Sequence, residues 1–389
     1  MKQLAAPLLP GATLGVLGGG QLGRMFVHAA QAMGYFTTVL DEDPTSPAGL
    51  VSHQHIQTGY QDPEGLAQLA EVSDAITTEF ENVPAVSLAA LAGQCFVAPA
   101  ARAVAVAQDR AQEKSHFVGC GVPCAPYAVI ETAEQLAGVD AGLLPGILKT
   151  ARLGYDGKGQ QRVQTAAELA TAWQTLEQVP CVLEKMLPLA LECSVIVARG
   201  ADGTVVNLPV QRNLHRNGIL AVTEVYEGNV PVALAAQAVA AAQSVAQGLD
   251  YVGVLCVEFF VLDDGSLVVN EIAPRPHNSG HYSQNACDVS QFELQVRTLA
   301  GLPLVQPRQH SAAVMLNLLG DLWFAHGDTA QTPPWDAVLA LPGTHLHLYG
   351  KTVAKHGRKM GHLNITAPTA DAARATALQA AALLGIAAF

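Results

Sequence analysis

The chain has 389 residues, of which 50% are hydrophobic and 14% are charged. This length allows two or three domains with a sizeable core, and the composition excludes an intrinsically disordered chain. The formal net charge of −12 argues against binding along a nucleic acid backbone, although local basic segments can still bind small phosphorylated molecules.

The first hundred residues alternate short apolar strands with helical segments. The run Thr13–Leu17 predicts a buried strand, and a helix is expected over Gln21–Met33, ending at Gly34. Further strands are expected at Tyr35–Leu40, His53–Thr58, Ala75–Thr78 and Cys95–Val97. Strands separated by helices predict an α/β domain with a doubly wound parallel sheet.

From about residue 109 the sequence becomes richer in strands. Helices are expected at Asp109–Gly119, near Ala133, at Ala166–Leu176 and at Val232–Gly248, with a polar glycine-rich stretch at Ala151–Gln161. Strands are expected at Tyr127–Ile130, Gly146–Thr150, Cys181–Glu184, Leu191–Ala198 and Val205–Val210, before a hairpin at Val252–Ile272. The last part predicts strands at Val314–Leu318, His345–Tyr349 and Met360–Thr366, and a helix at Asp371–Leu384.

A glycine-rich turn follows the first expected strand. Residues Gly18–Gly23 fit the spacing GxGxxG, open a helix, and are followed by Asp41 at the end of the next strand. This pattern is typical of dinucleotide binding, because glycines let a phosphate approach the helix N-terminus. The alternative is a tight strand-to-helix turn whose Gln21 side chain lines a cleft, and the motif alone leaves both open.

Two glutamates lie on the predicted hairpin. The strand-like runs Val254–Leu262 and Leu267–Ile272 are joined by a segment with an Asp-Gly turn signal. A two-residue or four-residue loop would place Glu258 directly opposite Glu271, with Cβ atoms ~4.5–5.5 Å apart. A cation would neutralise these like charges, so we predict a Mg²⁺ or Mn²⁺ site that Asn270 also reaches. The alternative is a solvated edge glutamate or a slipped register.

A lysine and a flexible loop precede this hairpin. Lys149 ends an expected strand, and the loop Gly154–Gln160 carries three glycines and Lys158. Such a loop can close over a ligand and donate backbone N–H groups to phosphate, with the lysines supplying charge. The spacing is not that of a P-loop, and a solvated surface loop is the alternative.

A strand that runs into a linker comes next, at Val182–Leu187. Backbone groups of such a linker can bind an adenine edge, and Glu192 on the following strand can accept hydrogen bonds from ribose hydroxyls. Each feature is weak alone, because a single glutamate is usually solvated.

Compartment and targeting can be judged from the cysteines and the termini. Seven scattered cysteines with no CxxC pair indicate reduced thiols in a cytoplasmic protein. The first ten residues carry one lysine and two prolines, which makes a poor signal peptide. The alanine-rich stretches are interrupted by polar residues, so we expect no membrane association.

Taken in chain order, these residues resemble the ATP-grasp superfamily. Within it, the chain is similar to the 5-(carboxyamino)imidazole ribonucleotide synthases of purine biosynthesis. The family-like stretches span nearly the whole chain and are Gly18–Met25, Thr78–Pro84, Gly154–Gln160, Asn270–His281 and Gly357–Asn364. Asn278–His281 and Gly357–Asn364 are much more specific than the first glycine motif.

The resemblance implies an α/β and α+β architecture in three parts. These are an N-terminal parallel-sheet (pre-ATP-grasp) domain at 1–107, an ATP-grasp domain at 108–303 with a mobile subdomain at about 126–187, and a small C-terminal domain at 304–389. It also implies that ATP, bicarbonate and 5-aminoimidazole ribonucleotide give ADP, phosphate and 5-(carboxyamino)imidazole ribonucleotide by way of carboxyphosphate. A homodimer is expected for such a protein.

The resemblance further implies the roles of individual residues. The ATP site would comprise Arg110, Lys149, Gly154, Tyr155, Asp156, Gly157, Lys158, Gly159, Gln160, Glu184, Lys185, Met186, Leu187, Glu192, His215, Asn270 and Glu271. Bicarbonate and carboxyphosphate would lie against Arg275, His277 and Asn278. Tyr155 and Asp156 would orient the substrate amine and accept its proton, while Lys158 helps to neutralise the transferred phosphoryl group.

A basic segment lies near the C-terminus. Gly350–His362 contains no acidic residue and four basic ones, Lys351, Lys355, Arg358 and Lys359. We expect Lys351, Arg358 and Lys359 to bind the ribonucleotide 5′-phosphate, with Lys351 also reaching the reacting carboxyl group; a solvated basic face is the alternative. The imidazole side of this cleft is expected to be lined by Gln21, Leu22 and Glu79.

Three alternatives compete with this hypothesis: two other enzymatic functions, and binding of a nucleotide without catalysis, against which the intact metal and phosphate residues count. Another ATP-grasp ligase, such as a formate-dependent glycinamide ribonucleotide transformylase, would keep the nucleotide residues but change the acceptor pocket, for which Gly357–Asn364 discriminates. An NAD(P)-dependent oxidoreductase would explain only the first glycine motif and would leave the Glu258–Glu271 pair without a role.

Overall fold

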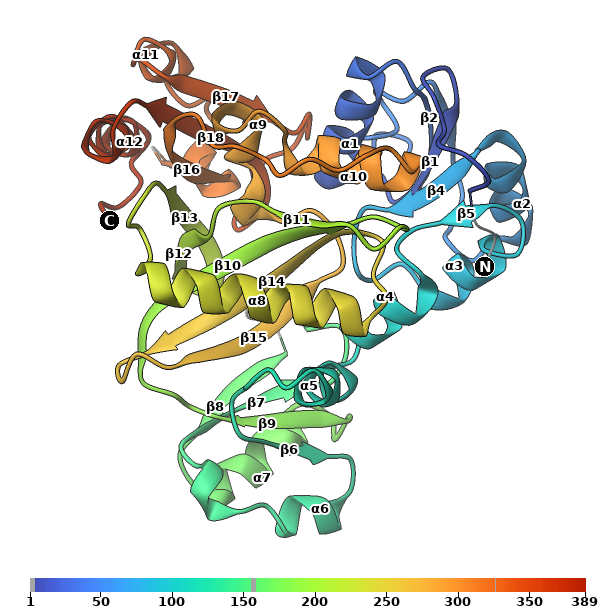
Figure 1. Cartoon of the computed structure of the whole chain (residues 1–389). Coiled ribbons are helices and arrows are strands. Elements are labelled where there is room, and N and C mark those ends of the chain that lie inside the picture. The colour runs from blue at the N-terminus through green and yellow to red at the C-terminus, as the bar shows by residue number, and fades with distance from the viewer. Residues whose placement is uncertain (1–3, 155–158, 326) are drawn as a thin grey trace.

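The computed structural model describes residues 4–154, 159–325 and 327–389. Three sheets of five, four and nine strands organise the chain. Figure 1 shows the four-stranded sheet as a lobe below the nine-stranded sheet, with the N-terminal sheet (blue) and the last strands (orange to red) above. Within the described ranges, no helix is both long and apolar enough to cross a bilayer.

The N-terminal sheet is entirely parallel, with strand order β3-β2-β1-β4-β5. Its strands are β1 (Thr13–Leu17), β2 (Phe36–Leu40), β3 (Gln54–Ile56), β4 (Ala75–Thr78) and β5 (Phe96–Val97). Helices α2 (Pro63–Val72) and α3 (Ala85–Leu91) cover one face, while α1 (Gln21–Ala32) and α10 (Gln291–Ala300) cover the other. The predicted doubly wound sheet is confirmed, and α10, far along the chain, supplies part of its cover.

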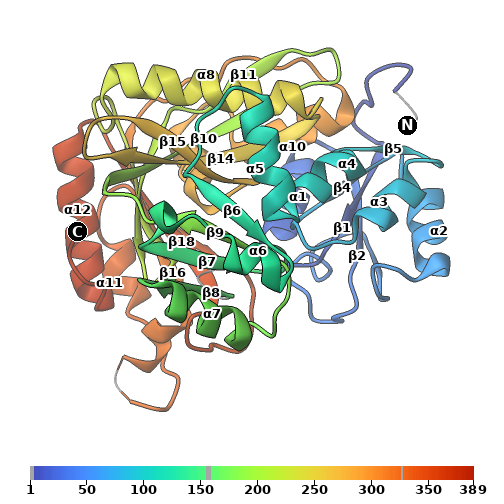
Figure 2. The ribbon, with the colours of Figure 1, turned by 90° about the horizontal axis from the view of Figure 1, so that it is seen from below.

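Two helices lead from this sheet into the rest of the molecule, α4 (Ala101–Ala107) and α5 (Arg110–Gly119). Seen from below in Figure 2, α5 lies beside the four-stranded lobe on the side of the N-terminal sheet. The side chain of Asp109 accepts the N–H groups of Ala111 and Gln112, which satisfies two donors at the start of α5.

The four-stranded lobe, called the lid below, is antiparallel with strand order β6-β9-β7-β8. Its elements are β6 (Tyr127–Ile130), α6 (Ala133–Ala137), η1 (Ala141–Leu143), β7 (Gly146–Thr150), β8 (Gln160–Val163), α7 (Ala166–Thr175) and β9 (Cys181–Lys185). Leu148, Leu169, Trp173 and Leu183 form its core. The stretch predicted as a polar loop ends earlier than expected, because Gln160 already pairs with Lys149 in β8.

The nine-stranded sheet has the order β15-β14-β10-β12-β13-β16-β18-β17, with β11 paired to β10. Its first part comprises β10 (Leu189–Arg199), β11 (Val205–Asn207), β12 (Gln211–Arg216), β13 (Ile219–Val225), β14 (Gly253–Leu262) and β15 (Leu267–Ala273). Helix α8 (Val232–Gly248) lies along one face (Figure 1), where Phe117 of α5 joins the same core. The short elements η2 (Asn278–Gly280) and α9 (Ser283–Ala286) follow β15.

The last strands continue this sheet and do not form one of their own. They are β16 (Ala312–Leu319), β17 (Thr344–Leu348) and β18 (Lys359–Ala367), accompanied by η3 (Gly320–Phe324), α11 (Trp335–Leu339) and α12 (Ala370–Leu384). β16 pairs with β13 across Val222 and Leu316. The expected small C-terminal unit is therefore joined to the central body by an unbroken ladder of strands.

The hairpin β14–β15 differs from the predicted register at its turn. Leu262 donates its N–H to Ser266 O, which leaves a three-residue loop where a two-residue or four-residue loop was expected. Gly265 in this loop has φ +81°, and a glycine in that region is typical of a three-residue hairpin connection. The turn prediction was wrong because a glycine two residues after Asp263 also fits this longer connection.

A β-bulge restores the predicted register nearer to the body of the sheet. The pairs on either side of it are Val257–Ile272 and Phe259–Val269. Two residues of β15, Asn270 and Glu271, therefore oppose the single residue Glu258 of β14. The predicted one-to-one pairing of the glutamates is corrected to a two-against-one arrangement, which places Asn270 beside them.

Candidate active site

A cavity of about 880 Å³ is lined by residues from the N-terminal sheet, the lid and both parts of the nine-stranded sheet. The predicted site residues that line it are Gln21, Leu22, Glu79, Arg110, Lys149, Gly154, Gln160, Glu184, Lys185, Met186, Leu187, Glu192, His215, Glu258, Asn270, Glu271, Arg275, His277, Asn278 and Lys359. Gly159, Lys351 and Arg358 are not among the lining residues. Tyr155, Asp156, Gly157 and Lys158 fall outside the described residues.

The two hairpin glutamates face this cavity in different surroundings. Burial and the charge of Glu271 raise the pKa of Glu258 to about 7. Burial also acts to raise the pKa of Glu271, but the Arg110 guanidinium, 3.1 Å from Glu271 Oε2, and Lys149 hold it below its ordinary value. The pair thus holds one ionised carboxylate beside one that resists ionisation, and a cation bound between them would stabilise the charged form of both.

Asn270 supports the same conclusion. Its Oδ1 is buried and has no hydrogen-bond partner among the residues that the structure describes. An orphaned buried oxygen is costly unless a ligand satisfies it. Two carboxylates and one amide oxygen are the donors that Mg²⁺ prefers, so the residues present fit a Mg²⁺ ion.

Helix α5 holds the strand that carries these ligands. Glu113 accepts the N–H of Ile272 at 2.7 Å, and Lys114 Nζ donates to Asn270 O at 3.1 Å. These two bonds flank Glu271 on either side. Both side chains are buried, and burial raises the pKa of Glu113 to about 8 despite the nearby Arg110. One turn of α5 therefore fixes the bulge.

Lys114 also joins the hairpin to the lid. Its Nζ lies 3.2 Å from Glu184 Oε2, and Lys149 Nζ lies 3.2 Å from Glu184 Oε1. Burial acts to raise the pKa of Glu184, but the two lysines hold it below its ordinary value. Lys149 and Glu184 sit on neighbouring lid strands, so one buried carboxylate ties both of them to α5.

An anion-binding corner follows β15. Arg275 pairs with Glu81, and His277 Nε2 lies 3.0 Å from Glu258 Oε1. The Nδ2 and Oδ1 atoms of Asn278 are both buried and lack a partner among the described residues. An amide with two unsatisfied atoms, next to an arginine and a histidine, is suited to a small oxyanion such as a carboxylate or phosphate.

Glu192 and His215 form a pair across β10 and β12. Burial acts to lower the pKa of His215, but the bond to Glu192 and the charge of Glu258 raise it above its ordinary value. Both residues line the cavity, near the hinge residues Lys185 to Leu187 that link the lid to β10.

Carboxylate side chains of the protein itself occupy the glycine turn after β1. Gly20 N–H donates to Glu79 Oε1 at 2.7 Å, and Gly23 N–H donates to Glu79 Oε2 at 2.9 Å. Asp41 Oδ2 accepts the N–H of Gly19 at 2.7 Å. The carboxylate of Glu79 thus occupies the place where a dinucleotide pyrophosphate would bind the helix N-terminus, which argues against the NAD(P) interpretation.

The basic segment lies at the edge of the cavity. Lys351 Nζ donates to Lys359 O at 2.7 Å and lies 5.8 Å from the centre of the Tyr349 ring. Burial, Arg358 and Lys359 lower the pKa of Lys351 to about 8. Lys359 and Tyr349 line the cavity, so Lys351 lies directly behind its wall.

Models of three known families match the chain in sequence. A ribonucleotide synthetase pre-ATP-grasp domain matches residues 11–108, an ATP-grasp domain matches 115–292, and a phosphoribosylaminoimidazole carboxylase C-terminal domain matches 313–376. The N5-carboxyaminoimidazole ribonucleotide synthase of Brucella melitensis is 43% identical over 93% of this chain and 98% of the relative. The chain belongs to this family. The same enzyme of Bacillus subtilis is 39% identical over 92% of each chain.

Solved structures of family members share the whole fold. The ADP complex of an N5-carboxyaminoimidazole ribonucleotide synthetase matches with a TM-score of 0.90 at 39% identity, covering 97% of this chain and 98% of the other. The Aspergillus clavatus N5-carboxyaminoimidazole synthase with ADP and 5-aminoimidazole ribonucleotide matches with a TM-score of 0.87 at 31% identity, covering 96% and 99%. The chain is an ATP-grasp ligase of this synthase family.

The sequence patterns did not indicate every element that supports the site. Glu113 and Lys114 lie three and four positions after Arg110, on one face of a polar helix that was predicted but was given no role beyond that of Arg110. The β12–β13 hairpin was missed because β12 is polar, although its turn at Asn217 and Gly218 is a strong hairpin signal.

The sequence patterns also gave no indication of a column of three histidine rings. The ring centres of His281 and His362 are 4.5 Å apart, as are those of His362 and His347. Burial lowers the pKa of all three rings. The column runs from the cavity wall at His281 to β17, and therefore packs the η2 segment against the last two strands.

Proposed function

We propose that the chain carboxylates the exocyclic amine of 5-aminoimidazole ribonucleotide with bicarbonate at the expense of ATP. The product is 5-(carboxyamino)imidazole ribonucleotide, an intermediate of purine biosynthesis. One observation carries the proposal: a single cavity joins the glutamate pair and its orphaned Asn270 oxygen to the orphaned Asn278 amide. A cation site and an oxyanion site side by side suit phosphorylation of a small carboxylate.

We place ATP between the lid and the nine-stranded sheet. The hinge Glu184–Leu187 offers backbone groups to adenine, and Glu192 and His215 lie where ribose hydroxyls would reach them. Lys149, with the loop Gly154–Gln160, is assigned to the phosphates. The lysine already lies 3.2 Å from a carboxylate, so a bound phosphate would compete with Glu184 for it.

We assign Glu258, Glu271 and Asn270 as the residues that hold Mg²⁺, or Mn²⁺ in its place. When bound, such an ion neutralises charge on the transferred phosphoryl group and its leaving oxygen. Arg110 remains next to Glu271 and keeps that carboxylate ionised, as a metal ligand requires.

Bicarbonate is assigned to Arg275, His277 and Asn278. The γ-phosphoryl group of ATP moves to a bicarbonate oxygen and gives carboxyphosphate and ADP. Carboxyphosphate then releases phosphate and carbon dioxide beside the amine, and the amine nitrogen forms a bond to the carbon of carbon dioxide as the amine loses a proton. Exclusion of water by lid closure would protect carboxyphosphate from hydrolysis.

The acceptor ribonucleotide is placed between the N-terminal turn and the last strands. Its imidazole would lie against Gln21, Leu22 and Glu79. Its 5′-phosphate would lie toward Lys351, Arg358 and Lys359, with Lys351 also near the reacting carboxyl group. Tyr155 and Asp156 are proposed to orient the amine and accept its proton, and Lys158 to contact the phosphoryl group.

We also propose a homodimer in the cytoplasm. The seven cysteines are free thiols, which supports a reducing compartment, and the dimer follows from the resemblance to the family. Light scattering of the purified protein would measure a mass near twice that of the chain; a monomeric mass at assay concentration would contradict the dimer.

The decisive assay measures ADP release with Mg²⁺-ATP and bicarbonate, with and without 5-aminoimidazole ribonucleotide. We expect release to depend on the ribonucleotide, and trapping of the labile carbamate would identify the product. Glu271→Gln should lower the rate by at least ~100-fold, because it removes one charge that holds the cation. Glu227→Gln, at an exposed position, is the matched control and should retain the wild-type rate.

Each other outcome has a distinct meaning. If ADP forms with formate and glycinamide ribonucleotide but not with bicarbonate and 5-aminoimidazole ribonucleotide, the ATP site stands and the acceptor assignment is wrong. If Glu271→Gln turns over like Glu227→Gln, the metal assignment fails. Binding of NAD(P) without turnover of any acceptor would overturn the proposal as a whole.

A further inference from the structure

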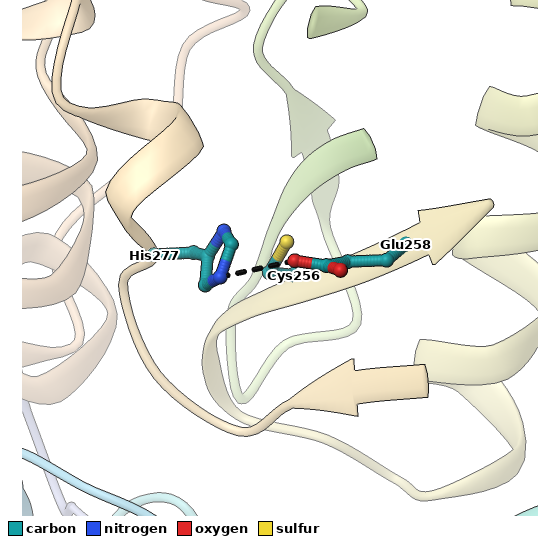
Figure 3. Close-up of side chains that lie close together, drawn as sticks. All are labelled: Cys256, Glu258 and His277. Atoms are coloured by element: carbon teal, nitrogen blue, oxygen red, sulfur yellow. Dashed lines mark ion pairs between the residues drawn. The ribbon is translucent and has the colours of Figure 1, made fainter. Parts of the chain in front are cut away.

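Three side chains of different chemistry meet at Glu258, one member of the glutamate pair. Cys256 and Glu258 lie two residues apart on β14 and point to the same face, while His277 approaches from the segment after β15 (Figure 3). Donor atoms of the three residues, one from each, all lie within 4.8 Å of one another. The ion pair between His277 Nε2 and Glu258 Oε1, at 3.0 Å, brings two of them together already.

We propose that Cys256, Glu258 and His277 form a binding site for a thiophilic divalent cation, specifically Zn²⁺. A sulfur, an imidazole nitrogen and a carboxylate oxygen are the donor types that Zn²⁺ takes in proteins, and three protein donors leave a fourth position for water. Small shifts suffice to bring the donors onto one ion, because Zn–S is ~2.3 Å and Zn–N and Zn–O are ~2.0–2.2 Å.

The surroundings of the three residues support a metal site that opens to the cavity. Cys256 is fully buried and lies in the core beneath the cavity, whereas Glu258 and His277 reach the cavity itself. His277 Nδ1 lies 2.9 Å from Ser279 Oγ and accepts the N–H of Ser279 at 3.3 Å. Binding of a metal at Nε2 therefore requires the ring proton to move to Nδ1, where Ser279 Oγ can accept its hydrogen bond. A cation entering from the cavity would therefore meet two ligands first and the sulfur last.

This site differs from the Mg²⁺ site in its donors and in its position. Mg²⁺ prefers oxygen donors, which are Glu258, Glu271 and Asn270 on the two strands. The thiophilic site shares only Glu258 and replaces the others by sulfur and nitrogen, which select softer metals. Glu258 cannot serve both arrangements fully, so Zn²⁺ would compete with Mg²⁺.

Two consequences follow. Coordination replaces the thiol proton of Cys256 by the metal and releases that proton to the solvent. Zn²⁺ would also occupy His277, which the proposed function assigns to bicarbonate, so the ion would inhibit turnover. The inhibition rests on the proposed function, whereas metal binding by the three residues does not.

Co²⁺ is the probe for binding, because a cobalt–thiolate bond gives a charge-transfer band in the near ultraviolet. The full chain without nucleotide is titrated with Co²⁺, and Zn²⁺ is then added to displace it. We expect one equivalent to produce the band and Zn²⁺ to abolish it. Cys256→Ala should lose the band and weaken metal affinity by at least the ~10–100-fold that loss of an outer-shell partner costs.

Cys287→Ala is the matched control, because Cys287 is a buried thiol in the same core cluster but outside the trio. It should keep the band and the Zn²⁺ affinity. Zn²⁺ inhibition of ADP release should be relieved in Cys256→Ala but not in Cys287→Ala. A wild-type protein without the band, or a Cys256→Ala protein that retains it, overturns the proposal.

A second measurement uses the unmodified protein, in case Cys256→Ala fails to fold. Crystals soaked with Zn²⁺ are examined for anomalous scattering at the zinc edge. We expect a peak bonded to Cys256 Sγ, Glu258 and His277. A peak held by Glu258 and Glu271 without the sulfur would overturn the thiophilic site while leaving the proposed function intact.

Discussion

Two regions of the molecule handle buried carboxylates in opposite ways. In the N-terminal turn, both oxygens of Glu79 accept backbone N–H groups, from Gly20 and Gly23. In the hairpin, Glu258 and Glu271 oppose each other across a bulge, and the charge of Glu271 helps to raise the pKa of Glu258. In the turn, backbone N–H groups satisfy both carboxylate oxygens. In the hairpin, Arg110 stabilises the charge of Glu271, and the carboxyl group of Glu258 is left with a pKa of about 7.

The comparison teaches how to separate a structural motif from a binding site. The glycines of the turn look like a phosphate site, but a Cβ at Gly20 would lie 2.3 Å from Glu79 Oε1, so they make room for a side chain. The two glutamates of the hairpin repel each other, but α5 holds the strand of Glu271 in place through Glu113 and Lys114. Buried polar groups that lack a partner, and that neighbouring residues hold in place, therefore indicate a ligand site.

The largest expected effect comes from removing the lysine behind the hairpin. Lys114→Met removes the cation at Asn270 O and Glu184 Oε2 while Lys149 still contacts Glu184, so the free energy of unfolding should fall by about 3 kcal/mol, the low end for breaking a buried pair. Urea denaturation measures this change. Arg102→Met, at an exposed position of α4, is the control and should change stability by no more than ~0.5 kcal/mol.

A double variant sharpens this test. Adding Glu184→Gln to Lys114→Met removes the carboxylate that the lysine neutralised, so the double variant should lose less stability than the two single losses added together. Strict additivity would show that Lys114 does not stabilise Glu184, and the proposed link from α5 to the lid would fail.

An intermediate effect is expected at the glycine turn. Glu79→Ala removes two hydrogen bonds at the start of α1 and should cost about 1–3 kcal/mol in unfolding free energy. Gly20→Ala should also destabilise, although its φ of −76° suits alanine, because the new Cβ meets the Glu79 carboxylate. The same denaturation experiment measures both.

The contact between these residues predicts strong coupling. In Gly20→Ala/Glu79→Ala the obstructing carboxylate is gone, so the glycine substitution should cost little beyond the loss of Glu79 itself. Equal costs of Gly20→Ala with and without Glu79 would show that the glycine serves another purpose, such as the approach of a phosphate.

A pH trend is expected at Glu113. Its pKa is raised to about 8 from an ordinary value of 4.5, so the folded protein binds a proton that the unfolded chain releases. The stability that this group contributes is complete below pH 4.5 and is lost as the pH rises through 8. The free energy of unfolding of Glu113→Gln should therefore rise relative to that of the wild type as the pH increases from 5 to 8, by no more than ~1.4 kcal/mol per pH unit.

Thermal or urea unfolding at several pH values measures this difference. Glutamine keeps an oxygen that can accept the Ile272 N–H, so the structural hydrogen bond is retained in the variant. A difference between the two proteins that stays constant with pH would contradict a neutral Glu113 and would place a charge behind the hairpin.

Local patterns allowed much of the fold to be predicted. The apolar runs of β1 and β4 match Thr13–Leu17 and Ala75–Thr78, and the parallel sheet follows from their alternation with helices. The glutamate pair was also predictable, because strand periodicity fixes which residues share a face. The turn was not, since an Asp-Gly signal fits loops of two, three or four residues and only the three-dimensional sheet selects one.

Long-range contacts were beyond the sequence patterns. Lys114 and Asn270 are separated by 156 positions, and nothing in either local sequence indicates the other. The pairing of β16 with β13 likewise depends on which sheet edge is free. The proposed domain boundaries and the roles of the individual site residues stay predictions, including those of Tyr155 and Asp156.

The shared ladder between β13 and β16 has a consequence for the biosynthesis of the chain. Until the strands after residue 311 emerge from the ribosome, β13 presents an open row of backbone donors and acceptors, a template for pairing with another nascent chain. A chain that ended near residue 304 would contain the assigned ATP and metal ligands but would keep β13 as an unpaired edge strand. Pairing with β16 therefore satisfies the backbone groups of β13 and moves the edge of the sheet to β17, while the last strands also supply part of the cavity wall.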